Sequence, residues 1–282
     1  MLTVGSLFSG IGGLDLGLER AGMRVVWQSE IDPYACKVLA KHWPEVPNHG
    51  DIKQIDWGTV ERPDVVCGGY PCQPFSNAGK RQGTDDPRHL WPWVRDAISA
   101  LRPRYAILEN VRGHLTLGGL SVITDLAQIG YDCEWRVVSA AGLGAPHRRN
   151  RLIIVAYPNS SDATDGRQRA DLQGQNTIWG NDRGRSERDF GQISVGRARQ
   201  NTGEMAYANG TRSQGRAKTQ NKKRQTATRH VGPSSWWEIE PDVGRVADGV
   251  PRRVDRLRGL GNAVVPQVAE YIGRLVIEHA SE

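Results

Sequence analysis

One cysteine of this sequence lies between two prolines, in the stretch GGYPCQPFSNAG at residues 68–79. Pro71 and Pro74 have fixed φ angles, so the loop around Cys72 has few conformations and presents its sulfur in a set position. Such a thiol suits a nucleophile, which must react as the thiolate in an electropositive or amide-rich setting. The alternative is a small buried hydrophobic side chain, the usual role of an isolated cysteine. That alternative is our interpretation of the other three cysteines, Cys36, Cys67 and Cys133.

A glycine-rich turn, SLFSGIGGLDLG at residues 6–17, follows the first apolar run and precedes a helical pattern. In α/β sheets, nucleotide-like ligands bind where strands end and helices begin, against the helix N-terminal amides. The dinucleotide fingerprint has glycines at its first, third and sixth positions, but the sixth position counted from Gly10 is Asp15. NAD is therefore disfavoured, and the turn favours a nucleoside that bears an amino acid and lacks a pyrophosphate. Its candidate contacts are Phe8, Gly10, Gly12 and Gly13.

Two acidic residues stand near the ends of later strand-like segments. Glu30 lies twenty residues after Gly10, the spacing at which an acid contacts ribose hydroxyls in such folds. Asp51 is placed to accept a hydrogen bond from an adenine amino group. The alternative is a simple tight turn with solvated acids at two strand ends. Because the glycines and the acids occur at successive strand ends, we favour a cofactor site.

Short apolar or β-branched runs predict six strands, at residues 2–8, 24–29, 64–67, 105–109, 135–139 and 151–157. Helical patterns are predicted at residues 14–21, 33–42, 93–101, 120–129 and 266–279. Strands that alternate with helices imply a parallel sheet covered on both faces. We expect the last helix to pack against this sheet.

The pattern fails between residues 159 and 234, where Gly, Ser, Thr, Asn, Gln and Arg dominate and too few apolar residues occur to build a core. This segment has 14 Lys and Arg against 7 Asp and Glu, so it carries a net charge of +7 while the whole chain carries +6. A basic, polar segment of this kind suits a nucleic-acid partner. The alternative is a solvated, disordered loop.

Composition excludes several classes of protein. With 282 residues and 38% hydrophobic residues, the chain is long and apolar enough for a sizeable core. No Cys-x-x-Cys pair or His and Cys spacing indicates a metal site or a disulfide framework, so we expect no metal. The first 22 residues lack the pattern of a signal peptide, and no apolar run approaches membrane-spanning length. We expect a cytoplasmic protein with no membrane partner.

Several short motifs resemble those of the DNA cytosine-5 methyltransferases, and they occur in that family's order over most of the chain. PCQPFS at 71–76 resembles the family's nucleophile loop, FSGIGG at 8–13 its S-adenosylmethionine loop, and ENV at 109–111 the block with a glutamate that acts on the base. GNAVVP at 261–266 is similar to the C-terminal block that packs on the cofactor. The resemblance implies an α/β fold, a Rossmann-like S-adenosylmethionine methyltransferase sheet with a smaller, irregular target-recognition domain.

The resemblance also implies roles for individual residues. The implied groups that act on the base are Cys72, Glu109, Arg149 and Arg151. The implied S-adenosylmethionine contacts are Phe8, Gly10, Gly12, Gly13, Glu30, Asp51, Ile52, Pro71, Leu90, Asn262, Ala263 and Val264. Two blocks depart from the family pattern: HRRNR at 147–151 has His147 where the family has glutamine, and DPRHLW at 86–91 is one residue short, with Trp91 for phenylalanine.

These expectations divide the chain into three parts. Residues 1–158 form a catalytic and cofactor-binding domain, residues 159–244 a basic target-recognition region that is partly disordered without DNA, and residues 245–282 a segment that returns to the first domain. The expected contacts to double-stranded DNA are Lys218, Lys222, Lys223, Arg224 and Arg229, in the densest basic stretch. We expect a monomer. A cognate restriction endonuclease is a candidate partner, but an orphan enzyme and a phage-borne protective enzyme fit the same sequence.

The expected reaction is methylation of carbon 5 of cytosine within a specific DNA sequence. Cys72 adds to carbon 6 of a flipped cytosine, while Glu109 acts at ring nitrogen 3 and the arginines hold oxygen 2 and a phosphate. One alternative is a tRNA cytosine-5 methyltransferase, because the chemistry does not distinguish RNA from DNA. Another is a DNA-binding relative without activity. The sequence does not show which bases surround the target cytosine.

Overall fold

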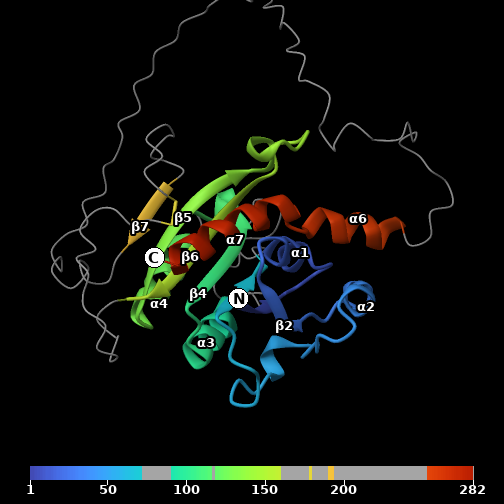
Figure 1. Ribbon diagram of the computed structural model, residues 1–282, viewed down its shortest axis with the longest axis horizontal. Helices are drawn as coiled ribbons and strands as arrows, with labels where there is room; N and C mark the ends of the chain where they lie inside the picture. Colours follow the sequence, from blue (N-terminus) through green and yellow to red (C-terminus); the bar gives the residue numbers. More distant parts are fainter. Residues whose placement is uncertain (72–89, 116–117, 160–177, 180–189, 194–252, 282) are drawn as a thin grey trace, which may run out of the picture.

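The computed structural model describes residues 1–71, 90–115, 118–159, 178–179, 190–193 and 253–281. These residues form a seven-stranded sheet, in the order β2-β1-β3-β4-β6-β5-β7, flanked by helices (Figure 1). No helix among them has the length and hydropathy to cross a bilayer. The strands are β1 Thr3–Leu7, β2 Arg24–Ser29, β3 Val65–Gly68, β4 Tyr105–Val111, β5 Tyr131–Ser139, β6 Asn150–Pro158 and β7 Phe190–Ile193.

The helices of the described chain lie mostly where the apolar spacing predicts them. The α-helices are α1 Gly13–Arg20, α2 Pro33–His42, α3 Trp91–Leu101, α4 Gly119–Gln128, α6 Arg253–Asn262 and α7 Pro266–Ser281. Short 3₁₀ helices follow three loops or strands: η1 Ile52–Gln54, η4 Arg112–Leu115 and η5 Ala140–Leu143. Asp32 starts α2 as its N-cap, where its side chain accepts hydrogen bonds from the Tyr34 and Ala35 amides. The predicted α/β class is confirmed.

The prediction of a parallel sheet is correct for only half of it. Strands β2, β1, β3 and β4 are parallel, whereas β6 runs antiparallel to both β4 and β5, and β7 runs antiparallel to β5. The physical reason is the connection between β5 and β6, which spans residues 140–149 and holds only η5. A parallel neighbour needs a crossover of a dozen or more residues, so this short link gives an antiparallel pair.

Two apolar clusters cover the two faces of the sheet. On one face α3 and α4 pack on alternate residues of the strands, among them Val66, Leu108 and Ile154. On the other face α1 and α7 pack on Val65, Ile107 and Ile153. These alternate strand residues point to opposite faces, as the pleat requires. Figure 1 shows α7 lying beside α1, so segments from the two ends of the chain share one layer.

Two short stretches within the range predicted for target recognition pack on the sheet itself. Strand β7 extends the sheet beyond β5. Ile178 and Trp179 are buried in the cluster on the α7 face. Buried Glu134 of β5 accepts hydrogen bonds from the Ile178 amide and the Tyr157 hydroxyl. The chain therefore keeps contact with the sheet after it leaves β6.

Candidate functional site

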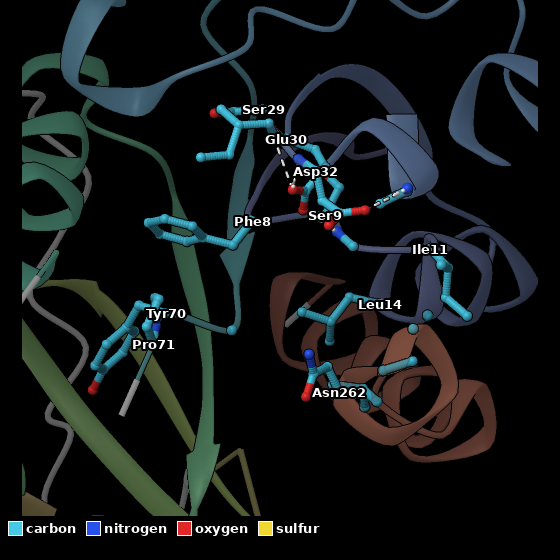
Figure 2. Close-up of a pocket in the computed structure, with 18 of the residues that line it drawn as sticks. Phe8, Ser9, Ile11, Leu14, Ser29, Glu30, Asp32, Tyr70, Pro71 and Asn262 are labelled. Atoms are coloured by element: carbon cyan, nitrogen blue, oxygen red, sulfur yellow. Dashed lines mark hydrogen bonds between the residues drawn. The ribbon is translucent and has the colours of Figure 1, made fainter. Parts of the chain in front are cut away.

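A cavity of about 630 Å³ opens at the carboxyl ends of the four parallel strands. Sheets of this kind bind ligands at this edge, because strand ends and helix N-termini converge there. Eleven of the predicted cofactor contacts line it: Phe8, Gly10, Gly13, Glu30, Asp51, Ile52, Pro71, Leu90, Asn262, Ala263 and Val264. Figure 2 shows Tyr70 and Pro71 on one side of the cavity and Leu14 and Asn262 on the other.

The glycine turn lines the cavity beside Glu30. Gly10 has a φ of +56° and its amide donates a 2.7 Å hydrogen bond to Glu30 Oε2. A Cβ on Gly10 would meet only the Phe8 carbonyl, at 3.9 Å, so this glycine is needed for its backbone conformation rather than for a tight contact. The turn and the acid at the end of β2 therefore hold each other in place.

The other two glycines of the turn, Gly12 and Gly13, pack closely against other parts of the protein. Gly12, with a φ of +82°, lines a second cavity of about 750 Å³, and a Cβ there would clash with the Trp43 ring. A Cβ on Gly13 would lie 2.5 Å from the Val264 carbonyl oxygen. The predicted cofactor contact of Gly12 is not supported by this placement, whereas Gly13 both lines the first cavity and lets the C-terminal segment approach α1.

Glu30, directly after β2, and Asp51, directly before η1, are held by backbone amides. Glu30 Oε1 accepts hydrogen bonds of 2.8 Å from the amides of Ile31 and Asp32. Asp51 caps η1 and accepts from the Lys53 amide at 3.0 Å. Amide donors fix a carboxylate without neutralising it. Both acids therefore line the cavity as oriented acceptors.

Glu109, on the last part of β4, is paired with Arg151 at the start of β6. Its Oε1 lies 2.7 Å from Nε of Arg151, and the side chain of Glu109 is only 10% exposed. Antiparallel pairing of the two strands sets this contact, because Val111 lies opposite Arg151. Burial raises the pKa of Glu109 above its usual range, while Arg151 and then Arg149 oppose that rise. Both members of the pair line the cavity.

Arg149 has partners different from those predicted. Its guanidinium donates to the carbonyl oxygens of Ala263 and, at 2.7 Å, Gly261, at the end of α6. Residues two apart on a strand point to one face, but Arg149 precedes β6 and has a φ of +30°, which breaks that alternation. It lines the second cavity, and burial lowers its pKa. The structure thus brings Arg151, not Arg149, to the cavity with Glu109.

Several residues that line the cavity were not predicted from the sequence. Ile31 follows Glu30 and is 67% exposed at the cavity wall, and Asp255 and Arg258 project from α6. An ion pair between Nη1 of Arg258 and Oδ2 of Asp32, 3.6 Å apart, connects α6 to the start of α2. Tyr70 and Asn110 also line the cavity. The sequence indicated Tyr70 and Asn110 only through their positions next to Pro71 and Glu109.

Some predicted residues lie outside the described part of the chain. These are the nucleophile candidate Cys72 and the DNA contacts Lys218, Lys222, Lys223, Arg224 and Arg229. Most of the predicted target-recognition region, 159–244, lies outside it as well. Within the described ranges, no three His, Cys, Asp or Glu side chains gather as metal ligands.

Comparisons with known proteins give a consistent family. The model of the family described as C-5 cytosine-specific DNA methylase matches residues 2–239. The type II methyltransferase M.Eco47II of Escherichia coli is 43% identical over 175 residues, covering 58% of this chain and 41% of its own length. M.BsuFI of Bacillus subtilis is 37% identical over 161 residues, covering 55% and 39%. The chain thus spans about two fifths of the length of these curated relatives.

A solved structure shows the same fold. A triple mutant of DNMT2 from Spodoptera frugiperda superimposes with a TM-score of 0.50 at 23% identity. The match covers 60% of this chain and 54% of that one. The sheet and its flanking helices are therefore those of a known architecture.

Proposed function

The chain belongs to the C-5 cytosine-specific DNA methylase family, and from that premise we propose that it methylates carbon 5 of cytosine in double-stranded DNA. One observation carries the proposal. The buried Glu109–Arg151 pair lines the same cavity as Glu30 and Pro71. Because Cys72 is bonded to Pro71, we propose that its thiol acts at this cavity together with the Glu109 carboxyl and the Arg151 guanidinium.

The cavity residues fit S-adenosylmethionine, the methyl donor that the family implies. The open space above Gly10 admits a ligand close to the backbone, and Glu30 and Asp51 offer acceptors for ribose hydroxyls and an adenine amino group. Ile31 and Phe8 offer apolar contact. When bound, this cofactor supplies an electrophilic methyl group. We propose that these residues hold it, together with Asn262 of the C-terminal segment.

Carbon 5 of cytosine is too weak a nucleophile to take a methyl group directly. In the proposed mechanism the Cys72 thiolate forms a bond to carbon 6, and the ring electrons move toward nitrogen 3, which takes a proton from Glu109. Carbon 5 of the resulting enamine is nucleophilic. After it has gained the methyl group, it loses its proton to a base, the carbon–sulfur bond breaks, and nitrogen 3 returns its proton to Glu109.

Burial suits Glu109 to this role, because it raises the pKa of the carboxyl and so favours the protonated form more than exposure to water would. Arg151 holds the carboxyl in place and offers further donors for oxygen 2 of the base. Its pairing also limits how far the pKa of Glu109 rises. The pair thus combines a proton donor with a fixed cation.

A cytosine in a duplex must leave the helix to reach this site, at a cost of roughly a few kcal/mol. We propose that residues 159–244 are the target-recognition region and offset that cost through phosphate contacts by Lys218, Lys222, Lys223, Arg224 and Arg229. Residues 1–158 then bind the cofactor, and 245–282 complete the cavity. The relatives' naming as type II methyltransferases supports a target within a specific sequence, with a restriction endonuclease as candidate partner.

The substrate is tested by transfer of a labelled methyl group from S-adenosylmethionine to double-stranded DNA and, in parallel, to tRNA. We expect incorporation into the DNA alone. Bisulfite sequencing of DNA from cells that express the protein then reports the methylated cytosines and the bases around them. Incorporation into tRNA alone would replace the proposed substrate with RNA.

The nucleophile is tested with Cys72→Ser, which exchanges the thiol for a hydroxyl that is not ionised at neutral pH. We expect methyl transfer to fall by at least about a thousandfold, while cofactor binding in calorimetry is retained. Cys36→Ser is the matched control, because Cys36 is partly exposed and its Sγ donates to the Glu30 carbonyl and accepts from the Asn48 side-chain amide, contacts that a serine hydroxyl can also make. Full activity in Cys72→Ser would refute the assignment.

A further inference from the structure

Tyr70 and His114 form a buried polar pair beside the proposed nucleophile loop. The Tyr70 hydroxyl and Nε2 of His114 are 2.9 Å apart, so one donates a hydrogen bond to the other. The two residues are 5% and 2% exposed, and their rings meet edge to face with centroids 5.5 Å apart. Tyr70 lies two residues before Cys72, whereas His114 lies on η4, just after the strand that carries Glu109.

The backbone around Tyr70 is held by the same strand and helix. The Asn110 side-chain amide donates to the Tyr70 carbonyl oxygen at 3.3 Å. A Cβ on Gly69 would lie 2.7 Å from Oε2 of Glu109, so this glycine lets the chain run close to that carboxylate. On its other side the Tyr70 ring packs against Trp91 of α3, with centroids 5.4 Å apart.

Tyr70 is therefore fixed at both its backbone and its side chain, and the hydroxyl contact is the one that depends on a chemically specific partner. Phenylalanine at position 70 would keep the ring contact with Trp91 and lose the hydroxyl contact with His114. Because Pro71 has a fixed φ angle, the orientation of Tyr70 restricts the direction in which the chain leaves Pro71. The residue after Pro71 is the candidate nucleophile, Cys72.

From this geometry we infer that His114 is a positioning residue, which acts through Tyr70 to place Cys72 relative to Glu109. The inference rests on the proposed function. His114 has no contact with the reacting atoms in this role. Its hydrogen bond ties the loop that carries the thiol to the segment that carries the carboxyl, so that both approach one base in a set geometry.

The test compares His114→Phe, which keeps a ring but removes the hydrogen bond, with His114→Gln, whose amide reaches the same point as Nε2. We expect His114→Phe to lower kcat about tenfold with the KM for S-adenosylmethionine unchanged, since misplaced reacting groups slow the chemical step. His114→Gln should retain most of the wild-type kcat. Tyr70→Phe should match His114→Phe in kcat, and the double variant should lose no more kcat than either single variant, since both changes remove the same hydrogen bond.

Tyr131→Phe is the control for a purely structural effect. Tyr131 is also fully buried, and its hydroxyl donates to the Pro103 carbonyl at 2.8 Å. It starts β5, which runs in the same direction as β4, so it lies at the end of the strands away from the cavity. We expect this variant to lower the Tm without lowering kcat. Equal kcat losses in Tyr131→Phe and His114→Phe, or an unchanged kcat in His114→Phe, would overturn the inference.

Hydrogen exchange at residues 69–79, measured without substrate, separates this inference from the proposed function. Faster exchange there in His114→Phe, and not in Tyr131→Phe, is expected from a positioning contact. If the wild-type protein transferred no methyl group but showed this pattern, the function would fail and the positioning contact would stand. Unchanged exchange would refute the contact's role even in an active methyltransferase.

Discussion

Buried carboxylates in this protein differ in what surrounds them. Glu109 has the guanidinium of Arg151 at 2.7 Å, whereas Asp15, in the first turn of α1, is held by neutral donors. The Ser6 hydroxyl and the Gln28 amide donate to its two oxygens at 2.5 and 2.6 Å. Burial nevertheless raises the pKa of Asp15 from 3.8 to about 6. Neutral donors therefore do not offset the loss of water around this charge.

This shift predicts a pH dependence of stability. The folded protein binds a proton at Asp15 more tightly than the unfolded chain does. Protonation of Asp15 therefore stabilises the folded protein fully below pH 3.8, and this contribution is lost as the pH rises through about 6. The loss between about pH 4.5 and pH 7.5 is on the order of 2 kcal/mol. Asp15→Asn removes this pH-dependent loss of stability, because asparagine does not ionise. The Gln28 side-chain amide can turn so that its oxygen accepts from the asparagine amide. Urea denaturation of both proteins at the two pH values measures the difference.

The comparison isolates Asp15 because Glu109 and Glu134, whose pKa values burial also raises, are present in both proteins. We expect the gap in unfolding free energy to move in favour of Asp15→Asn as the pH rises. A gap that stays constant with pH would contradict the shift.

At the scale of elements, the contact between α1 and α7 depends on glycine. A Cβ on Gly17 of α1 would lie 2.3 Å from the Pro266 carbonyl oxygen and 2.4 Å from Cβ of Ala269. A Cβ on Gly273 of α7 would lie 2.7 Å from Cβ of Ala21. The two helices therefore approach along surfaces that have no side chains at these points. The same approach brings Val264 against Gly13 at the cavity.

We predict that Gly17→Ala destabilises the protein by about 1 to 3 kcal/mol, because overpacking outweighs the helix propensity that alanine gains. It should also weaken S-adenosylmethionine binding, since α7 and the residues before it shift. The matched control is Gly261→Ala on α6, where an added Cβ would meet nothing within 4 Å. Chemical denaturation of both variants tests this, and equal stabilities would contradict the packing argument.

The elements that could be predicted from the sequence are those whose own residues determine them. The spacing of Val268, Ile272 and Val276 predicts α7, and these residues are buried. Helix α6 was not predicted, because Val254 and Leu257 are exposed and it has no amphipathic pattern to detect. Strand β7 forms only by pairing with the edge of β5, so its own composition does not indicate it.

The site residues also divide into those that the sequence predicts and those that only the folded chain brings together. Glu30 and Gly10 were predicted from their spacing, because the end of β2 and the turn after β1 have fixed places in a parallel sheet. Arg149 and Arg151 could not be distinguished by sequence, since both match one motif. Only the backbone angle at Arg149 directs its guanidinium to α6. Tyr70 and His114, 44 residues apart, meet only in the folded chain.

At the scale of the whole molecule, the proposal assigns DNA affinity to charges outside the described sheet. Replacing Lys222, Lys223 and Arg224 with alanine should weaken DNA binding and lower the slope of log affinity against log salt by up to about 3, because each lost phosphate contact contributes about 0.9. S-adenosylmethionine binding should not change. Fluorescence anisotropy with a labelled duplex at several salt concentrations gives both affinity and slope.

Arg274→Ala is the control, because Arg274 is an exposed arginine of α7 that pairs with Glu270 outside the basic segment. We expect it to leave the slope unchanged. An unchanged slope in the triple variant would show that these three residues do not contact phosphates.

The wall that α6 and the residues after it contribute to the cavity has a consequence for biosynthesis. Asn262, Ala263 and Val264 line the same cavity as Gly10 and Glu30 but are translated more than 200 residues after them. A nascent chain that stops before residue 262 has the glycine turn and lacks these three residues of the opposite wall. If the proposed function holds, prematurely terminated chains should neither retain S-adenosylmethionine nor methylate DNA.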